Sequence, residues 1–349
     1  MSHGGLLIAS DLHAHSWSRF ATTLPNGTNS RVADLWKIFD QLESYIEEWR
    51  PTYVVIPGDL THRRYFVQFS IYTELMRRIT RLREEYGVGI IVLVGNHDIE
   101  SEGHHSLGPL RFIEGVEVID EPKWVDLWEN VRTFFCPYMS GDRVAEAFRA
   151  QKHERAPLAI THYAFDGKAM GASEYAVPST LRKEDVENFD RVILGHVHTP
   201  CVEDDGRIIY VGSVMHFDFG DYGNRYAWYF PIDNGAPRAL PLKAPRFVST
   251  TYPRIAVPPL EESGFLRVLD TPAEMFEDVR RSAIEAGWLA CLPIEARMPV
   301  EAVRTLSSAV IADEQVVRAY VERQYPDLSE QHRQEITAFG LDCLREAQR

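Results

Sequence analysis

The chain has 349 residues, of which 45% are hydrophobic and 25% charged, and its formal net charge is −14. This length suits two domains, or one large domain with appendages. The acidic balance argues against a protein that holds DNA by charge alone, because such proteins are usually basic. It does not exclude a nuclease whose metal ions offset part of the local negative charge.

Neither a membrane protein nor a disulfide-stapled protein is indicated. No apolar run is long enough to span a membrane, and the first residues lack a signal-peptide pattern, so we expect a cytoplasmic protein without membrane contact. The four cysteines are far apart and form no CxxC pair, which argues against a disulfide framework or a thiolate zinc site.

Short apolar runs recur along the first 200 residues, and each is followed by polar residues. The runs are residues 6–10, 53–56, 90–94, 158–160 and 192–194. The polar residues are Asp11, His13, Asp59, Asn96, His97, Asp98, His162, His196 and His198. Such runs predict buried strands, and open α/β folds place their sites at the carboxyl ends of strands. We expect Gly58, Gly95 and Gly195 to let the backbone turn sharply there.

Helices are predicted between these strands. Apolar residues recur at helical spacing over 32–49, with Ser30 as the expected N-cap, and again over 67–86. A short helix is expected over 183–190. This alternation of strand and helix predicts a layered α/β domain.

The pattern changes after His198. Strands are expected over 207–212, 226–230 and 238–242, completing a second sheet without helices. A small α+β unit should follow, with a strand at 265–269, a helix at 272–286 and an apolar run at 288–295. Two helices, 313–324 and 330–347, are then predicted, with Ser329 as the N-cap of the second.

The polar residues supply nitrogen and oxygen donors for two metal ions. Asp11-x-His13 and His196-x-His198 each place two side chains on one side of an extended segment. Asp59 carries two oxygens and can bridge two cations. Any one of these histidines is more often structural, but the complete ordered set favours a site. Such donors suit Mn²⁺, Fe²⁺ or Zn²⁺, and paired metals cleave phosphate esters.

The order D-x-H, G-D, G-N-H-D, H, G-H-x-H resembles the calcineurin-like metallophosphoesterase superfamily over roughly residues 6–230. The resemblance implies a four-layer α-β-β-α sandwich with two mixed sheets and a dinuclear centre. It assigns one metal to Asp11, His13, Asp59 and His198. It assigns the second metal to Asp59, Asn96, His162 and His196. Mn²⁺ is the expected ion, with Mg²⁺ and other divalent ions left open.

Within the superfamily, His62 three residues after Asp59, and Asp98 after His97, resemble SbcD-like nuclease subunits of double-strand-break repair and phage recombination. The resemblance implies three parts: a nuclease domain (1–245), a small DNA-facing capping domain (246–298) and a C-terminal helical segment (299–349). That segment would dock on an SMC/ABC-type ATPase, and a homodimer is also compatible. The chain departs from the usual D-x-H-L-G pattern, since Ala14 and His15 replace the Leu and Gly.

The remaining roles follow from the chemistry of phosphodiester cleavage. His97 is the expected proton donor to the leaving oxygen, and Asp98 would orient it by accepting a hydrogen bond. His62 would hold the phosphate or orient DNA, and Arg63 and Arg64 would contact phosphates. His15 is expected to be a bystander.

The favoured function is therefore a DNA exo/endonuclease subunit of an SbcCD-like recombination or repair complex. The alternative is a stand-alone phosphodiesterase for cyclic nucleotides or other small esters, which the acidic charge fits equally well. A non-enzymatic scaffold for an ATPase is a third possibility, and a missing ligand would support it.

Overall fold

The computed structural model describes residues 4–128, 131–151, 155–170, 175–176, 179–231, 235–255, 258, 263–295, 321 and 329–347. The chain divides into two compact units, Met1–Ala296 and Arg297–Arg349. The division into three functional parts at residues 245 and 298 stays a prediction. The arrangement of strands and helices does not show which function each part has.

The first six-stranded sheet has the order β16-β15-β1-β2-β3-β6. Its parallel strands are β1 (Gly5–Ile8), β2 (Tyr53–Ile56), β3 (Gly89–Leu93) and β6 (Val116–Ile119). The strand β15 (Arg225–Pro231) lies antiparallel to β1, with Leu7 opposite Tyr229, and β16 (Arg238–Leu242) lies antiparallel to β15. Buried β-rich runs in parallel array are typical of a sheet covered on both faces.

The second six-stranded sheet has the order β13-β14-β12-β9-β8-β7. Its inner strands β8 (Val131–Cys136), β9 (Ala156–Thr161), β12 (Phe189–Leu194) and β14 (Ile208–Tyr210) are parallel. The edge strands β7 (Lys123–Trp128) and β13 (Cys201–Glu203) are antiparallel to their neighbours.

One sequence prediction about the sheets is wrong. The segments 226–230 and 238–242 form strands, but they complete the first sheet as β15 and β16 rather than the second. Of the three segments predicted after His198, only the one around Ile208 joins the second sheet. Strand periodicity is a local property and carries no information about which distant strand becomes the partner.

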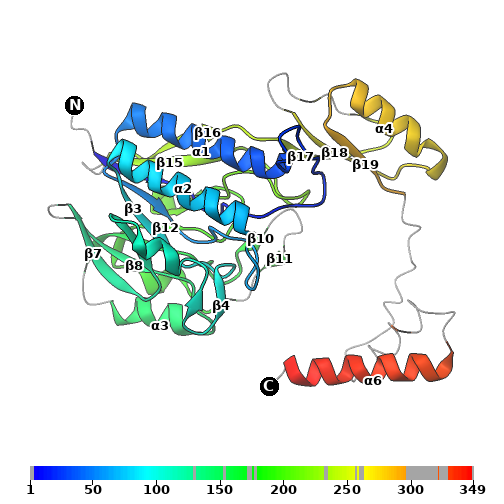
Figure 1. The fold of residues 1–349 in the computed structure, drawn as a ribbon. Coiled ribbons are helices and arrows are strands. Elements are labelled where there is room, and N and C mark those ends of the chain that lie inside the picture. The colour runs from blue at the N-terminus through cyan, green and yellow to red at the C-terminus, as the bar shows by residue number, and fades with distance from the viewer. Residues whose placement is uncertain are drawn as a thin grey trace. The chain divides into compact units, whose positions relative to one another are not determined.

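The two sheets stack face to face, with helices on their outer faces (Figure 1). Leu6, Ile8 and Val55 of the first sheet pack in one buried cluster with Phe135 and Ile193 of the second. The helices α1 (Ser30–Trp49) and α2 (Phe69–Tyr86) cover the other face of the first sheet, and α3 (Arg143–Ala150) covers the second. Alternate residues of each strand therefore pack into an inner core between the sheets and an outer core beneath the helices. Each buried hydrophobic side chain contributes about 1.5–3 kcal/mol to the stability of the fold.

The helices predicted over 32–49 and 67–86 are confirmed as α1 and α2, with one corrected cap. The N-cap of α1 is Asn29, whose side chain accepts hydrogen bonds from the amides of Arg31 and Val32. Ser30 is the first helical residue, and its hydroxyl accepts from the Thr22 amide instead. The segment expected as a helix over 183–190 contains the 3₁₀ turn η3 (Lys183–Val186), and β12 follows it from Phe189.

A parallel three-stranded sheet, β17-β18-β19, follows the two large sheets along the chain. It consists of β17 (Arg246–Thr251), β18 (Gly264–Leu269) and β19 (Ala290–Pro293), with η5 (Ala273–Met275) and α4 (Phe276–Glu285) between the last two strands. A separate cluster around Leu266, Val279 and Trp288 forms its core. The predicted strand, helix and apolar run are confirmed here, whereas β17 was not predicted.

The shorter elements lie along the chain between strands of the same sheet. They are β4 (Ile99–Ser101), β5 (His104–His105), η1 (Gly108–Phe112), β10 (Ala169–Met170), β11 (Tyr175–Ala176) and η4 (Asp204–Gly206). In the second unit the helix α6 (Glu330–Ala347) matches its prediction, while the helix expected at 313–324 lies outside the described residues except for Val321. None of the described helices is long and apolar enough to cross a membrane.

Candidate metal centre

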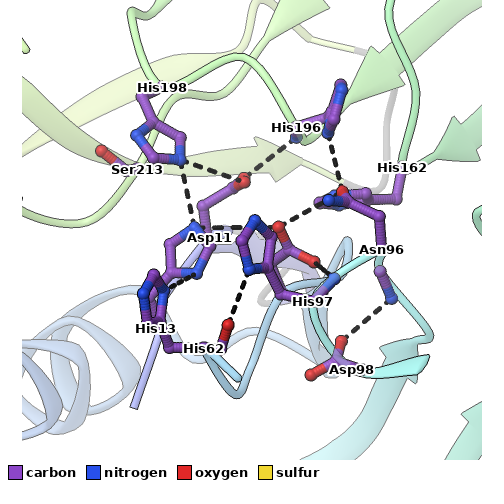
Figure 2. Close-up of polar contacts among 12 residues, drawn as sticks. Asp11, His13, His62, Asn96, His97, Asp98, His162, His196, His198 and Ser213 are labelled. Atoms are coloured by element: carbon purple, nitrogen blue, oxygen red, sulfur yellow. Dashed lines mark hydrogen bonds and ion pairs between the residues drawn. The ribbon is translucent and has the colours of Figure 1, made fainter. Parts of the chain in front are cut away.

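The polar residues expected to bind metal meet where strands of both large sheets end. Asp11, Asp59 and Asn96 follow β1, β2 and β3 of the first sheet, and His162 and His196 follow β9 and β12 of the second. Because parallel strands end at the same edge of a sheet, the loops that follow them converge. Figure 2 shows the resulting group of side chains, with His198, His196 and His162 facing Asp11, His13 and Asn96.

The backbone is strained at four of these residues. Asp11, His13, Asp59 and His196 have φ values of 54°, 46°, 51° and 76°, in the left-handed region that side-chain-bearing residues avoid. Such a conformation costs about 1–3 kcal/mol per residue and persists only where neighbouring contacts impose it. Here the Asp11 and His13 amides donate to the Gly58 and Asp59 carbonyls at 3.2 and 2.9 Å. The fold therefore holds donor groups in a conformation that the local sequence disfavours.

Three glycines allow these loops to approach closely. Only Gly58 has a left-handed φ, of 103°, so the sharp turn expected at all three positions is found at one. A Cβ atom at Gly95 would lie 2.2 Å from Asp59 Oδ1 and 2.3 Å from the Asp59 amide nitrogen. A Cβ atom at Gly195 would lie 2.5 Å from Ser10 Oγ. Gly95 and Gly195 are thus required by lack of space rather than by backbone conformation.

The first donor cluster contains Asp11, His13 and His198, whose ligand atoms all lie within 4.8 Å of one another. His13 Nε2 is 3.1 Å from His198 Nε2, and His198 Nε2 is 3.9 Å from Asp11 Oδ1. The second cluster contains Asp59, His162 and His196.

Asn96 and Asp59 complete the two clusters. Asn96 Oδ1 lies 3.1 Å from His162 Nε2 and 2.9 Å from His196 Nδ1. Asp59 Oδ2 lies between the clusters, 3.7 Å from His13 Nε2 and 3.3 Å from His162 Nε2. The structure thus brings together all seven residues that the sequence assigned to metal, with Asp59 at the shared position.

Two observations show that this donor set fits cations. Asp11 Oδ1 is buried without a hydrogen-bond partner among the described residues, an arrangement that is costly unless a positive charge offsets it. Burial acts to lower the pKa of His162, yet the charge and hydrogen bond of Asp59, the charge of Asp11 and the Pro57 carbonyl together raise it to about 9. The carboxylates therefore draw positive charge into the cluster. Nitrogen and oxygen donors of this kind accept several divalent ions and do not select one.

The histidine rings are held by partners behind them. His162 Nδ1 is 2.5 Å from the Pro57 carbonyl oxygen. His198 Nδ1 is 3.3 Å from Asp221 Oδ1, and the other oxygen of Asp221 accepts from the Phe217 amide at 2.7 Å. Such partners fix the tautomer and orientation of a metal-binding imidazole.

Asp221 was not identified from the sequence. It lies in the loop before β15, buried beside Arg225 at 3.3 Å. Burial would raise the pKa of Asp221, but His198 and Arg225 keep it well below its usual range, so the carboxylate is charged. No motif marks this position, and only its spatial contact with His198 shows its importance.

Replacing Asp221 with asparagine should weaken binding of the cation held by His198 by about 10–100-fold, because the imidazole loses its charged partner. Divalent-ion titration followed by calorimetry would measure this change. Asp218→Asn is the matched control, since Asp218 is exposed in the same loop and its Oδ1 accepts from the nearby Gly220 amide. Equal affinities in the two variants would contradict the role given to Asp221.

His62 and His97 lie beside the first cluster. Their rings stack at 5.2 Å between centroids and 13° between planes, and His62 Nδ1 is 3.2 Å from His13 Nδ1. The His97 amide donates to Asp59 Oδ1 at 2.8 Å. Both rings are therefore close enough to the donor clusters to contact a phosphate bound there.

The role predicted for Asp98 is wrong. Its carboxylate turns inward and accepts from the amides of Gly95 at 2.9 Å and Thr61 at 2.8 Å, and from the Thr61 hydroxyl at 2.9 Å. Burial raises its pKa to about 7, and the charge of Asp59 adds to this. The group that orients His97 is the His62 carbonyl, 2.6 Å from His97 Nδ1. Asp98 instead ties together the two loops that carry Asp59 and Asn96.

The two arginines that follow His62 differ in their contacts. Both are exposed, but Arg64 Nε donates to the Asn96 carbonyl at 3.0 Å. Within the described part of the chain, the Arg63 guanidinium has no hydrogen bond or ion pair. Three arginines of α2 are ion-paired: Arg77 and Arg78 with Glu74, and Arg81 with Glu85. This part of α2 is therefore a solvated, ion-paired helix face.

The sequence of this chain is similar to those of known phosphoesterases. The profile of the calcineurin-like phosphoesterases matches residues 5–200. The D subunit of the SbcCD nuclease of Staphylococcus epidermidis is 25% identical over 213 residues, which cover 53% of this chain and 56% of that protein. The chain thus spans about half the length of the curated relative it matches.

Three solved structures also resemble the chain at low identity. The phosphoesterase Yfce of E. coli matches 65% of this chain and 88% of its own, with 18% identity and a TM-score of 0.32. A dimetal phosphatase of Danio rerio matches 61% and 88%, with 11% identity and a TM-score of 0.35. The nuclease MPE of Pseudomonas putida matches 68% and 87%, with 17% identity and a TM-score of 0.29. Likenesses at this level carry no information about substrate.

Proposed function

Because the chain belongs to the calcineurin-like phosphoesterase family, we propose that it is a phosphodiesterase that cleaves DNA with two divalent cations. We further propose that it acts as the nuclease subunit of an SbcCD-like recombination or repair complex. Mn²⁺ is the proposed ion, with Mg²⁺ as the second choice. The metal ligands proposed for it are the seven residues of the two donor clusters.

The position of His62 carries the nuclease part of this proposal. Its ring lies against both His13 and His97, with centroids 5.1 and 5.2 Å away, at the edge of the donor clusters. A second imidazole beside His97 gives the site two ring donors for one phosphodiester. The similarity to a relative named as a nuclease subunit supports the same reading.

The chain's own residues would divide the work at the phosphate. Bound cations would supply neutralisation of the phosphate charge and activation of a water nucleophile. The His62 carbonyl accepts from His97 Nδ1, which leaves His97 Nε2 as the nitrogen that faces substrate. His97 in its imidazolium form would donate from Nε2 to the leaving sugar oxygen.

The hydrogen-bond chain behind His13 determines what His62 can do. If Nε2 of His13 held a cation, its Nδ1 would carry the proton and would donate to His62 Nδ1, which lies 3.2 Å away. Neutral His62 then carries its single ring proton on Nε2. This N–H is free to donate to a phosphate oxygen, as a substrate-binding group requires. Arg64 would add its charge at the Asn96 loop.

An end-labelled linear duplex tests the proposed function. The purified chain with Mn²⁺ should shorten or nick the duplex, and a chelator should stop the reaction. Bis(p-nitrophenyl) phosphate and cyclic nucleotides are compared in parallel. Hydrolysis of the small esters with intact DNA, in the presence and absence of an ATPase partner, would favour the stand-alone phosphodiesterase.

The ATPase is proposed to bind the C-terminal segment. In α6, Phe339 is 72% exposed and Ile336 lies three residues before it, so the two form an apolar patch on one helix face. An apolar helix face of this kind is typical of coiled-coil docking.

Phe339→Asp should abolish co-purification of the ATPase, because a carboxylate would be buried in an apolar interface. Phe112→Asp is the matched control, since Phe112 is 91% exposed in the other unit. Full retention of the ATPase by Phe339→Asp would show that docking uses another surface.

A further inference from the structure

His15 replaces the glycine of the usual motif, and the structure places it against the proposed substrate-binding ring. Its centroid is 5.1 Å from that of His62, with 32° between the planes. Trp17 packs on both, with centroids 5.3 Å from His15 and 4.3 Å from His62. His15 is half-buried by these contacts, so its ring is held in place rather than free to rotate.

The positive charge of Arg63 acts on both His15 and His62. Burial is the main cause of the lowered pKa of His15, and the positive charge of Arg63 is the second. Burial likewise lowers the pKa of His62 to about 3, with His97, His15 and Arg63 adding to the effect. Because Arg63 is exposed and directly follows His62, whose ring packs on that of His15, the three residues form one cluster beside the first donor cluster.

The polar atoms of this cluster are not used by the protein. Across the described ranges, neither ring nitrogen of His15 and no nitrogen of the Arg63 guanidinium has a hydrogen-bond or ion-pair partner. His62 uses only Nδ1, toward His13. Neutral His15 still offers one N–H donor, and Arg63 offers several.

Another part of the site's surroundings has a different character. A hollow of about 510 Å³ is lined there by Arg64 and Tyr138, and Tyr138 lies 6.2 Å from His196 between ring centroids. Its lining includes the acidic residues Glu100, Glu102, Asp120 and Glu121. Two of those carboxylates are ion-paired, Glu102 with Arg143 and Asp120 with Arg111. Arg63, by contrast, has no acidic partner among the described residues, and its unpaired charge favours a second anion on the side of His15.

We propose that His15, Arg63 and the Nε2 edge of His62 bind the phosphate next to the scissile one. The site would then recognise a nucleic-acid strand with consecutive phosphates rather than an isolated diester. This inference rests on the proposed phosphodiesterase function and assigns its substrate class. It also gives His15 a binding role in place of the bystander role expected from the sequence.

Three dinucleotides with the same cleavable bond test the subsite. They are dithymidine monophosphate without an end phosphate, with a 5′-phosphate and with a 3′-phosphate. With Mn²⁺, one of the two end phosphates should raise kcat/KM about tenfold or more, as expected for charge-assisted hydrogen bonds. Chromatography of the products would show that the internal bond is the one cleaved.

The test quantity is the ratio of kcat/KM with the favoured end phosphate to kcat/KM without it. The variants His15→Phe and Arg63→Gln should lower this ratio toward one. Phenylalanine keeps the ring contacts with His62 and Trp17 but removes both nitrogens, and glutamine removes the charge. A structural role would change cleavage of all three dinucleotides equally and leave the ratio intact. Arg77→Gln is the control, because it removes the same charge from an ion-paired position on α2 and should keep the full ratio.

Each result is informative. A ratio near one in the unmodified protein, or an unchanged ratio in both His15→Phe and Arg63→Gln, would overturn the subsite while leaving the phosphodiesterase function standing. Cleavage of none of the three dinucleotides would contradict the proposed function itself, and the subsite with it.

Discussion

Replacing His97 with alanine should leave both cation sites filled and slow DNA cleavage by about 10²–10⁴-fold, the usual contribution of a positioned proton donor. The side chain contacts the His62 carbonyl, while only the backbone amide of His97 contacts Asp59. Its removal therefore takes away the proton donor without removing a ligand. Metal content by mass spectrometry and cleavage of labelled DNA would be measured on the same sample.

A comparison of substrates with different leaving groups distinguishes a role of His97 as proton donor from a structural role. p-Nitrophenolate leaves without a proton, so hydrolysis of bis(p-nitrophenyl) phosphate should fall much less than cleavage of DNA in His97→Ala. His104→Ala is the control, because His104 is exposed and its ring hydrogen-bonds with Ser101 and the Glu102 carbonyl. Loss of metal together with activity would make His97 a ligand and contradict its role as the acid.

Asp59→Asn should weaken binding of both cations by more than about 100-fold, since even loss of a partner behind a ligand costs 10–100-fold. Oδ2 of Asp59 faces His13 of one cluster and His162 of the other. Asparagine keeps the size and one oxygen but loses the charge that two cations would share. The number of ions per chain, measured by titration, should fall for both sites together.

Asp221→Asn provides the comparison for this result. Among the seven donor residues this carboxylate contacts His198, so its removal should affect one cation and leave the other. If Asp59→Asn still bound two ions with unchanged affinity, Asp59 would not be the shared ligand. Asp218→Asn, in an exposed loop position, should behave like the unmodified protein.

The buried carboxylate of Asp98 shows where local reasoning fails. The sequence places Asp98 next to His97, and adjacency suggested a hydrogen bond between them. In the structure the chain between Gly95 and Asp98 turns, so the carboxylate meets the Gly95 amide and the Thr61 amide instead. Neighbours in a tight turn point in different directions, and the direction depends on the loop packed against them.

Asp221 shows the complementary failure. It is 23 residues away from His198 and belongs to no recognisable motif, yet its carboxylate is 3.3 Å from that ring. The contact exists because the loop before β15 passes the site as the chain crosses from the second sheet back to the first. That crossing is also what the sequence-based assignment of 226–230 to the second sheet missed.

The sequence by itself determined the strands that precede the donor residues, the main helices and the order of the donor residues, because these depend on hydrophobic periodicity and on which side chains follow each strand. Only the tertiary structure decided the partner of β15, the inward turn of Asp98, the contact of Asp221 with His198, and the place of His15 beside His62. These depend on contacts between segments far apart in the chain, where packing and charge select among directions that the local sequence leaves equivalent.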